Sequence, residues 1–246
     1  MIKLSNISTV PPMDVDKKAL QKQTKNNCKE IARLQAIMIA QSKYNLLVVF
    51  QGMDASGKDG AVKNVFKYCN PSGIRVKGFK KPTDEEFAHD FLWRIHKNAP
   101  QKGMIQIFVR SHYEDVLIQR VHKWISEEHA IKRINAINAF EELLEFDNNT
   151  IVLKFYLHLS FDQQTIELQQ RIDDPTKHWK HNPGDWEERK HWDEYMRCYE
   201  DVLDRSSIPW KITPVDERWY RDYVVSTTIV QAMRKLDLKY PKLEIE

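Results

Sequence analysis

The sequence predicts an α/β fold of the P-loop kinase type, a three-layer sandwich with a central parallel sheet and a helical lid. An apolar run at 46–51 leads directly into the glycine-containing turn 52–60. Strand-like runs then alternate with helical patterns, which implies a parallel sheet with helices on both faces. The segment 171–192 is dense in charge and tryptophan, and it follows the fourth strand and its helix, where phosphotransferases of this architecture carry a lid.

The first half of the chain contains three of the predicted strands. Residues 1–16 are polar and interrupted by proline, which predicts a flexible N-terminal arm. A helix follows, because apolar residues recur at helical spacing from Ile31 to Met38. The predicted strands are 46–51, 74–79 and 104–109, and the predicted helices are 17–43, 58–69 and one that Asp84 opens, with Phe87, Phe91, Leu92 and Ile95 on one face.

The second half continues the alternation. The predicted helices are 131–146 and 216–238, and the predicted strands are 151–157 and 210–214. Neither an internal repeat nor a low-complexity tract divides the chain. We therefore predict a single P-loop kinase domain over residues 1–246, with the lid at about 171–192.

Composition excludes several classes of protein. A hydrophobic fraction of 41% supports a substantial core, and the net charge of +3 does not mark a nucleic-acid binder. No apolar run approaches the roughly 18–20 residues that a membrane helix needs. The N-terminus lacks the apolar segment of a signal peptide. Three cysteines without motif spacing favour a reducing, cytoplasmic location and argue against a metal cluster.

The turn after the first strand matches the phosphate-loop pattern GxxxxGK through Gly52, Gly57 and Lys58. Backbone N–H groups in such a loop wrap a phosphate, and the following helix adds a favourable dipole. The pattern expects Ser or Thr after the lysine, but this chain has Asp59, and a second acid, Asp54, lies inside the loop. Two carboxylates indicate a loop that holds metal–phosphate complexes. The predicted phosphate- and nucleotide-binding residues also include Met53, Ala55, Ser56 and Gly60.

A second group of charges follows the third strand. Arg110 comes at its carboxyl end, where ligands gather in parallel sheets. Val109 occupies the position that often carries a metal-binding acid. Glu114 and Asp115 lie one turn into the next helix, and either could complement the loop aspartates around magnesium.

Basic residues gather in two further places. Four of them fall within seven residues that contain no acid, which predicts a groove for a polyanion: Arg75, Lys77, Lys80 and Lys81. The lid segment carries others that could close over phosphates: Arg171, Lys177, Lys180 and Arg189. The sequence contains no Ser-His-Asp pattern and no cysteine in a nucleophile motif. Phosphoryl transfer needs no protein nucleophile, because positioning and charge neutralisation suffice.

Read together, four blocks resemble the type 2 polyphosphate kinases, in particular the class III-like enzymes that act on both AMP and ADP. The blocks are GMDASGKDGAVKNV at 52–65, RSHYEDVLIQRV at 110–121, DPTKHWK at 174–180 with DWEERKHWDEY at 185–195, and PWKITPVDERWYRDYVVS at 209–226. The resemblance covers about residues 17–240. It implies reversible phosphoryl transfer between inorganic polyphosphate and nucleoside mono- or diphosphates, with Mg²⁺ or Mn²⁺, in a homodimer or homotetramer.

The resemblance also implies roles for individual residues. Lys58 would contact the transferred phosphate, while Asp54 and Asp59 would hold magnesium and orient the acceptor. Arg110 would match the arginine after strand three, and Arg171 the arginine that opens the lid, with Lys177 and Lys180 as lid lysines. Glu114, within the stretch SHYED, resembles the pattern of the subgroup that accepts both nucleoside mono- and diphosphates. Related sequences carry an acid or Asn where this chain has Val109, which leaves the metal to Asp54, Asp59 and Glu114.

Two alternatives remain open from the residues alone. An ATP-dependent kinase of nucleoside monophosphates or small metabolites would share the loop and lid but take its phosphate from a nucleotide. A regulatory protein that binds nucleotides or polyanions without turnover would need fewer positioned charges. Neither alternative predicts that polyphosphate serves as a donor.

Overall fold

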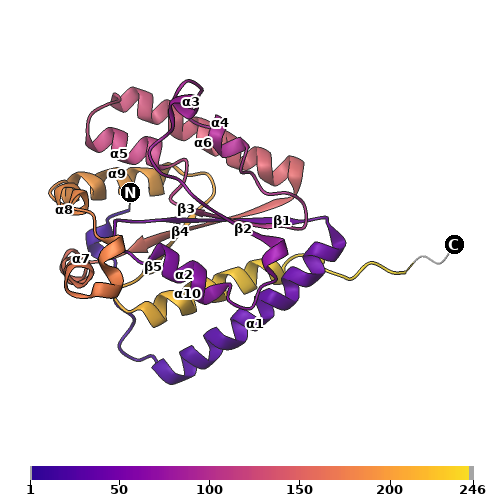
Figure 1. The fold of residues 1–246 in the computed structure, drawn as a ribbon. Coiled ribbons are helices and arrows are strands. Elements are labelled where there is room, and N and C mark those ends of the chain that lie inside the picture. The colour runs from indigo at the N-terminus through magenta and orange to yellow at the C-terminus, as the bar shows by residue number, and fades with distance from the viewer. Residues whose placement is uncertain (1, 244–246) are drawn as a thin grey trace.

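The computed structural model describes residues 2–243. Within them, parallel strands form one sheet in the order β2-β3-β1-β4-β5. The strands are β1 (Asn45–Gln51), β2 (Ile74–Gly78), β3 (Ile105–Val109), β4 (Thr150–His158) and β5 (Trp210–Pro214). β1 is central and buried throughout, because helices cover both faces of the sheet. The predicted three-layer α/β class is therefore confirmed (Figure 1).

Successive side chains of β1 pack into two different hydrophobic cores, one on each face of the sheet. Leu46, Val48 and Phe50 pack under α1 (Lys17–Gln41), α2 (Lys58–Val65) and α10 (Arg218–Arg234). Leu47 and Val49 point to the opposite face, on which α5 (Glu114–Val121), α6 (Glu127–Asn148) and α9 (Trp192–Arg205) lie. Figure 1 shows these two helical layers with the sheet between them. Since alternate residues of a strand point to opposite faces, one apolar run supplies both cores.

The predicted lid corresponds to the end of α7 (Phe161–Asp173), a 3₁₀ segment η3 (Pro175–Lys180) and the short helix α8 (Gly184–Arg189). α7 begins at the Ser160 cap, whose hydroxyl accepts a hydrogen bond from the Gln163 N–H. These elements lie beside the carboxyl ends of the strands in Figure 1. No helix among the described residues is long and apolar enough to cross a bilayer.

The N-terminal arm differs from its prediction over residues 2–9. Leu4 is buried in a 3₁₀ turn, η1 (Leu4–Asn6), and its backbone N–H donates to Glu200 of α9. The Ile7 carbonyl lies 3.0 Å from Nε2 of His158. Residues 2–9 are therefore held against the body of the protein. The burial of Leu4 and the hydrogen bonds to Glu200 and His158 stabilise this position.

The helix predicted from Asp84 is wrong as a single element. Two short helices take its place, α3 (Asp84–Phe87) and α4 (Trp93–His96), and Phe87 is 79% exposed. Asp90 accepts a hydrogen bond from the Leu92 N–H, which competes with the helical backbone and separates the two turns. Only the later apolar residues, such as Ile95, reach the core.

The sequence reasoning did not predict α9. Its buried side chains recur at helical spacing: Tyr195, Cys198, Tyr199, Val202 and Leu203. Charged residues occupy much of the rest of the helix, which is the pattern of an amphipathic surface helix and would have allowed its prediction. β5 has the predicted ends, the other predicted elements are present with shifted ends, and a 3₁₀ turn, η2 (Pro71–Gly73), follows α2.

Candidate active site

The phosphate loop lies at the carboxyl end of β1, and its glycines are sterically required. Gly52 has φ 148°, and a Cβ there would lie 2.7 Å from the Leu157 carbonyl oxygen. Gly57 has φ 84°, and its Cβ would lie 2.3 Å from Nη1 of Arg221. Residues other than glycine rarely adopt these backbone conformations. The GxxxxG spacing therefore follows from the shape of the turn.

Lys58 is the first residue of α2, and its amine is fixed inside the loop. The Nζ atom donates to the carbonyls of Gly52, at 2.7 Å, and Met53, at 3.0 Å. Burial lowers the pKa of Lys58 to about 8, although the nearby Asp54 carboxylate opposes this shift. An anionic phosphate beside the amine would favour its charged form.

Asp54 and Arg110 form an ion pair across the ends of β1 and β3. Arg110 adopts a left-handed φ of 62°, which turns the chain out of β3 while its N–H still bonds to Phe50. Burial by itself disfavours the ionised carboxyl, but the Arg110 and Lys58 cations outweigh it and lower the pKa of Asp54. Asp54 is therefore a carboxylate over the ordinary pH range.

A cavity of about 630 Å³ opens between the loop and the lid. Basic side chains outnumber acidic ones on the described part of its wall. The basic residues are Lys58, Lys80, Arg110, Arg171, Lys177, Lys180, Arg218 and Arg221, and the acids are Asp54, Asp59, Glu167 and Asp185. Such a wall suits a ligand that carries several negative charges.

The lid cations reach this cavity with partners of their own. Arg171 donates to Asp185 at 2.6 Å, and Lys177 lies 3.3 Å from Asp174. The Lys180 ammonium lies 4.9 Å from the Trp179 ring centre. All three line the cavity together with residues of the phosphate loop. Arg189, which was predicted with them, is instead buried and is not part of the described wall.

The predicted polyphosphate residues divide into two groups. Lys80, which follows the end of β2, lines the large cavity. Arg75 and Lys77 lie along the edge strand itself, and neither they nor Lys81 contribute to the described wall. The reason is positional, because the site forms where parallel strands end and not along their length.

A smaller cavity of about 240 Å³ adjoins the first. The two cavities share Asp54, Arg110, Asn182 and Asp185. The other residues on its wall include apolar and aromatic groups and two further acids: Gly52, Met53, Ile118, Gly184, Tyr195, Tyr199, Glu114 and Glu188. A space with a polar mouth and aromatic walls suits a nucleoside better than a phosphate chain.

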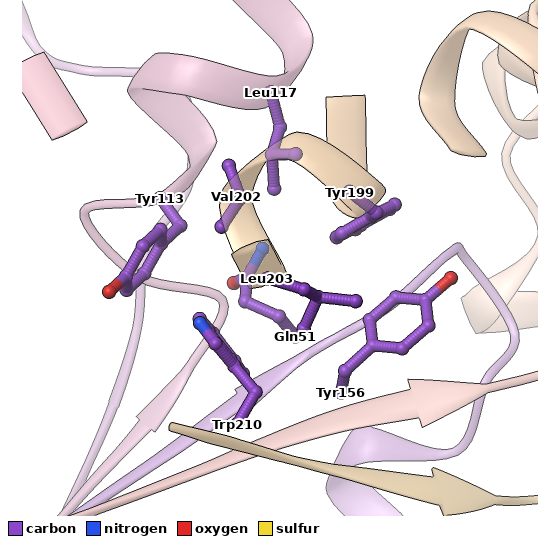
Figure 2. A pocket seen from close by; sticks show the side chains of 8 residues that line it. All are labelled: Gln51, Tyr113, Leu117, Tyr156, Tyr199, Val202, Leu203 and Trp210. Carbon is purple, nitrogen blue, oxygen red and sulfur yellow. The ribbon is translucent and has the colours of Figure 1, made fainter. Parts of the chain in front are cut away.

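A cluster of closely packed side chains lies against the wall of this second cavity. Figure 2 shows Gln51, Tyr113, Tyr156, Tyr199 and Trp210 among the side chains that converge there, and the space between them is too small for water. The Gln51 amide donates to Glu114 at 2.9 Å. Tyr199 belongs to both the cluster and the cavity wall, so the packing fixes the wall.

A family model described as polyphosphate kinase 2 matches residues 14–241. The chain belongs to the polyphosphate kinase 2 family. The resemblance seen in the four sequence blocks is therefore confirmed, and with it the assignment as a polyphosphate-dependent phosphotransferase.

Individual relatives are similar to this chain over most of their own length. An AMP/ADP-polyphosphate phosphotransferase of Meiothermus ruber is 43% identical over 88% of this chain and 82% of its own. An ADP-polyphosphate phosphotransferase of Rhodopseudomonas palustris is 37% identical over 95% and 86%. The crystal structure of polyphosphate kinase 2 from Arthrobacter aurescens TC1 superposes with a TM-score of 0.95 at 37% identity, covering 100% of this chain and 89% of that one.

Kinases generally use a divalent metal ion, and the residues of this site fit one in part. Among residues 2–243, no three His, Cys, Asp or Glu side chains form a ready metal cluster. Asp54 borders both cavities, Asp59 only the larger and Glu114 only the smaller. The predicted trio is thus not one preformed site, but Mg²⁺ commonly takes one or two carboxylates and completes its shell with phosphate and water. Asp54 fits that pattern.

Two arginines on the wall of the large cavity were not predicted from the sequence. Arg221 is buried, donates to the Gly57 carbonyl at 3.0 Å and pairs with Asp222 at 2.7 Å. Arg218 pairs with Glu167 on α7. Both stand in the fourth sequence block, but their distance from the loop along the chain offers no spacing rule by which to place them. Ser56 is the predicted loop residue that does not line either cavity, since its side chain is buried near Lys58.

Proposed function

We propose that this protein transfers the terminal phosphoryl group of inorganic polyphosphate to AMP and to ADP, reversibly and with Mg²⁺, for which Mn²⁺ can substitute. The observation that carries the proposal is the meeting of the two cavities at Asp54 and Arg110. The large basic cavity suits polyphosphate, and the smaller one, with its aromatic wall, suits the nucleoside. The names of the relatives support the same pair of substrates.

In the forward direction, a phosphate oxygen of the nucleotide attacks the terminal phosphorus of polyphosphate. The P–O bond to the rest of the chain breaks, and polyphosphate shortened by one unit leaves. Lys58 and Arg110 neutralise charge on the transferred group, and Arg171 adds charge from the lid side. Positioning and charge neutralisation of this kind account for most catalysis in phosphoryl transfer.

The metal ion would lie against Asp54, with Asp59 and Glu114 as further candidate ligands. When bound, Mg²⁺ neutralises charge on phosphate oxygens and orients them. Asp54 would also hold Arg110 toward the transferred group, since the two side chains are paired.

The test uses the purified chain with long-chain polyphosphate and Mg²⁺ but without ATP. ADP should form from AMP, and ATP from ADP. Formation of ATP from ADP without phosphorylation of AMP would refute the role of Glu114 in accepting both nucleotides. Phosphorylation that requires ATP as the donor would refute the proposed donor. The cytoplasmic location and the dimeric or tetrameric state stay predictions, and a sedimentation measurement tests the latter.

A further inference from the structure

We propose that Gln164 is a positioning residue that couples the lid helix α8 to the backbone of the phosphate loop. This inference rests on the proposed phosphoryl transfer, because its consequence is measured as turnover. Gln164 lies in the first turns of α7 with its side chain buried. It has no place among the residues that line either cavity.

The Gln164 amide joins two structures that are far apart in sequence. Its Nε2 donates to the Asp54 carbonyl oxygen at 3.0 Å, and its Oε1 accepts from Nη1 of Arg189 at 2.8 Å. Arginine offers only donors and a carbonyl only acceptors, so the chemistry fixes which way the amide points. A glutamine supplies both functions in one side chain.

The bond to Asp54 falls at a strained point of the loop. The Asp54 carbonyl belongs to the peptide plane that precedes Ala55, whose φ is 67°. Alanine is disfavoured in this left-handed region, and such conformations persist only where surrounding contacts hold them. The Gln164 amide is one such contact. Rotation of this peptide would also turn Asp54, whose carboxylate pairs with Arg110.

The second partner of the Gln164 amide, Arg189, belongs to the lid. Arg189 is the last residue of α8, and it also donates to the Phe161 carbonyl at 2.8 Å and the Thr165 hydroxyl at 2.5 Å. Displacement of α8 would leave the buried Gln164 oxygen without its charged partner, which is costly. The observed position of α8 and the observed conformation of the phosphate loop therefore stabilise each other through Gln164.

Two substitutions separate this role from simple packing. Gln164→Met keeps the shape and removes both hydrogen bonds. Its kcat should fall about tenfold or more, since small displacements of a positioned group cost large factors in rate. The KM for polyphosphate should change less than about twofold, because the cavity wall is intact. Gln169→Met is the matched control, since Gln169 is exposed on the same helix and, among the described residues, its side chain hydrogen-bonds only to Asp173 of that helix. Its kcat should equal that of wild type.

Gln164→Glu tests the bond to Asp54 while it keeps the contact with Arg189. A Glu side chain paired with Arg189 still accepts from this arginine but, as a carboxylate, cannot donate to the Asp54 carbonyl. The kcat of this variant should therefore fall at least tenfold, as for Gln164→Met, with a KM for polyphosphate within about twofold of wild type. Because the contact with Arg189 survives, this variant remains informative even if Gln164→Met does not fold.

The outcomes are distinct. Turnover by wild type in the same assay establishes the reaction, and its absence refutes the proposed function and not the role of Gln164. With wild type active, a folded Gln164→Met variant within twofold of wild type in kcat overturns the inference. A folded Gln164→Glu variant within twofold of wild type in kcat overturns it as well.

Discussion

The carboxylate of Asp54 is paired with the guanidinium of Arg110, and this ion pair lies where the two cavities meet. One partner comes from the loop after β1 and the other from the residue after β3. The strands are neighbours in the sheet, so their carboxyl ends bring the two charges together. Both cavities are therefore bordered by this carboxylate, which can hold a metal ion, and by this guanidinium, which can bind phosphate.

Asp54→Asn should lower kcat by about 100-fold or more and raise the Mg²⁺ concentration needed for half-maximal rate, because it removes a loop carboxylate that borders both cavities and pairs with Arg110. Glu114→Gln and Asp59→Asn serve as comparisons, and each should shift the metal requirement less. Rates measured across a Mg²⁺ titration decide the order. An unchanged metal requirement in a folded Asp54→Asn variant would exclude Asp54 as a ligand.

Lys58→Met should reduce kcat roughly 10³-fold, as for removal of one preorganised donor. The pKa of Lys58 is lowered to about 8 by burial, with Asp54 opposing. Bound polyphosphate should raise it again, so binding above pH 8 should take up protons. Calorimetry in buffers of different ionisation enthalpy measures that uptake, and the Lys58→Met variant should lack it.

The same shift affects stability without ligand. The unfolded chain, with an ordinary lysine pKa of 10.5, binds more protons than the folded one between about pH 8 and 10.5. Lys58 should therefore make the free energy of unfolding increase as the pH rises through this window. Equal slopes for wild type and Lys58→Met in urea titrations would contradict the lowered pKa.

Arg171→Ala should lower kcat about 100-fold with little change in melting temperature, because Arg171 faces the cavity and its partner Asp185 lies on the wall as well. Arg189→Ala should lower both quantities, since Arg189 is buried and anchors α8 to α7. Thermal melts alongside kinetics separate these cases. Normal turnover by folded Arg171→Ala would remove it from the catalytic set.

Lys80→Ala should raise the KM for long polyphosphate several-fold and make its salt dependence shallower by about one charge, by analogy with counterion release from nucleic acids. Lys81→Ala is the matched control, because the adjacent Lys81 is exposed and lies outside the cavity wall. The KM for AMP should change little in either variant. Identical salt dependence in all three proteins would place the polyphosphate groove elsewhere.

A buried ion pair beneath the site should matter for folding. Lys154 lies 2.5 Å from Glu141, and both side chains are fully buried. Lys154→Met alone should cost about 3–5 kcal/mol, because it removes the ammonium and leaves the buried Glu141 carboxylate with only His112 and Tyr113 as partners among the described residues. The double variant with Glu141→Leu should recover only part of that loss, because His112 and Tyr113 then lose this acceptor. Lys132→Met breaks an exposed pair with Glu128 and should change urea unfolding little.

Much of the phosphate loop could be predicted from consecutive residues. The GxxxxGK spacing, the apolar strand before it and the helix after it are local features, and backbone sterics alone require glycine at Gly52 and Gly57. The alternation of strands and helices likewise predicted the parallel sheet. The four sequence blocks were sufficient for the family, since together they carry the loop, the lid and the last helix.

The tertiary structure decided what meets the loop. Gln164 reaches Asp54 across 110 residues of chain, and Arg221 reaches Gly57 across 164. Only Lys80 of its basic cluster lines the cavity, since β2 is an edge strand and the site forms at the strand ends. Spacing along a chain determines turns and periodic faces because these depend on neighbouring residues. Contacts between distant side chains depend on strand order and helix packing, which only the folded sheet fixes.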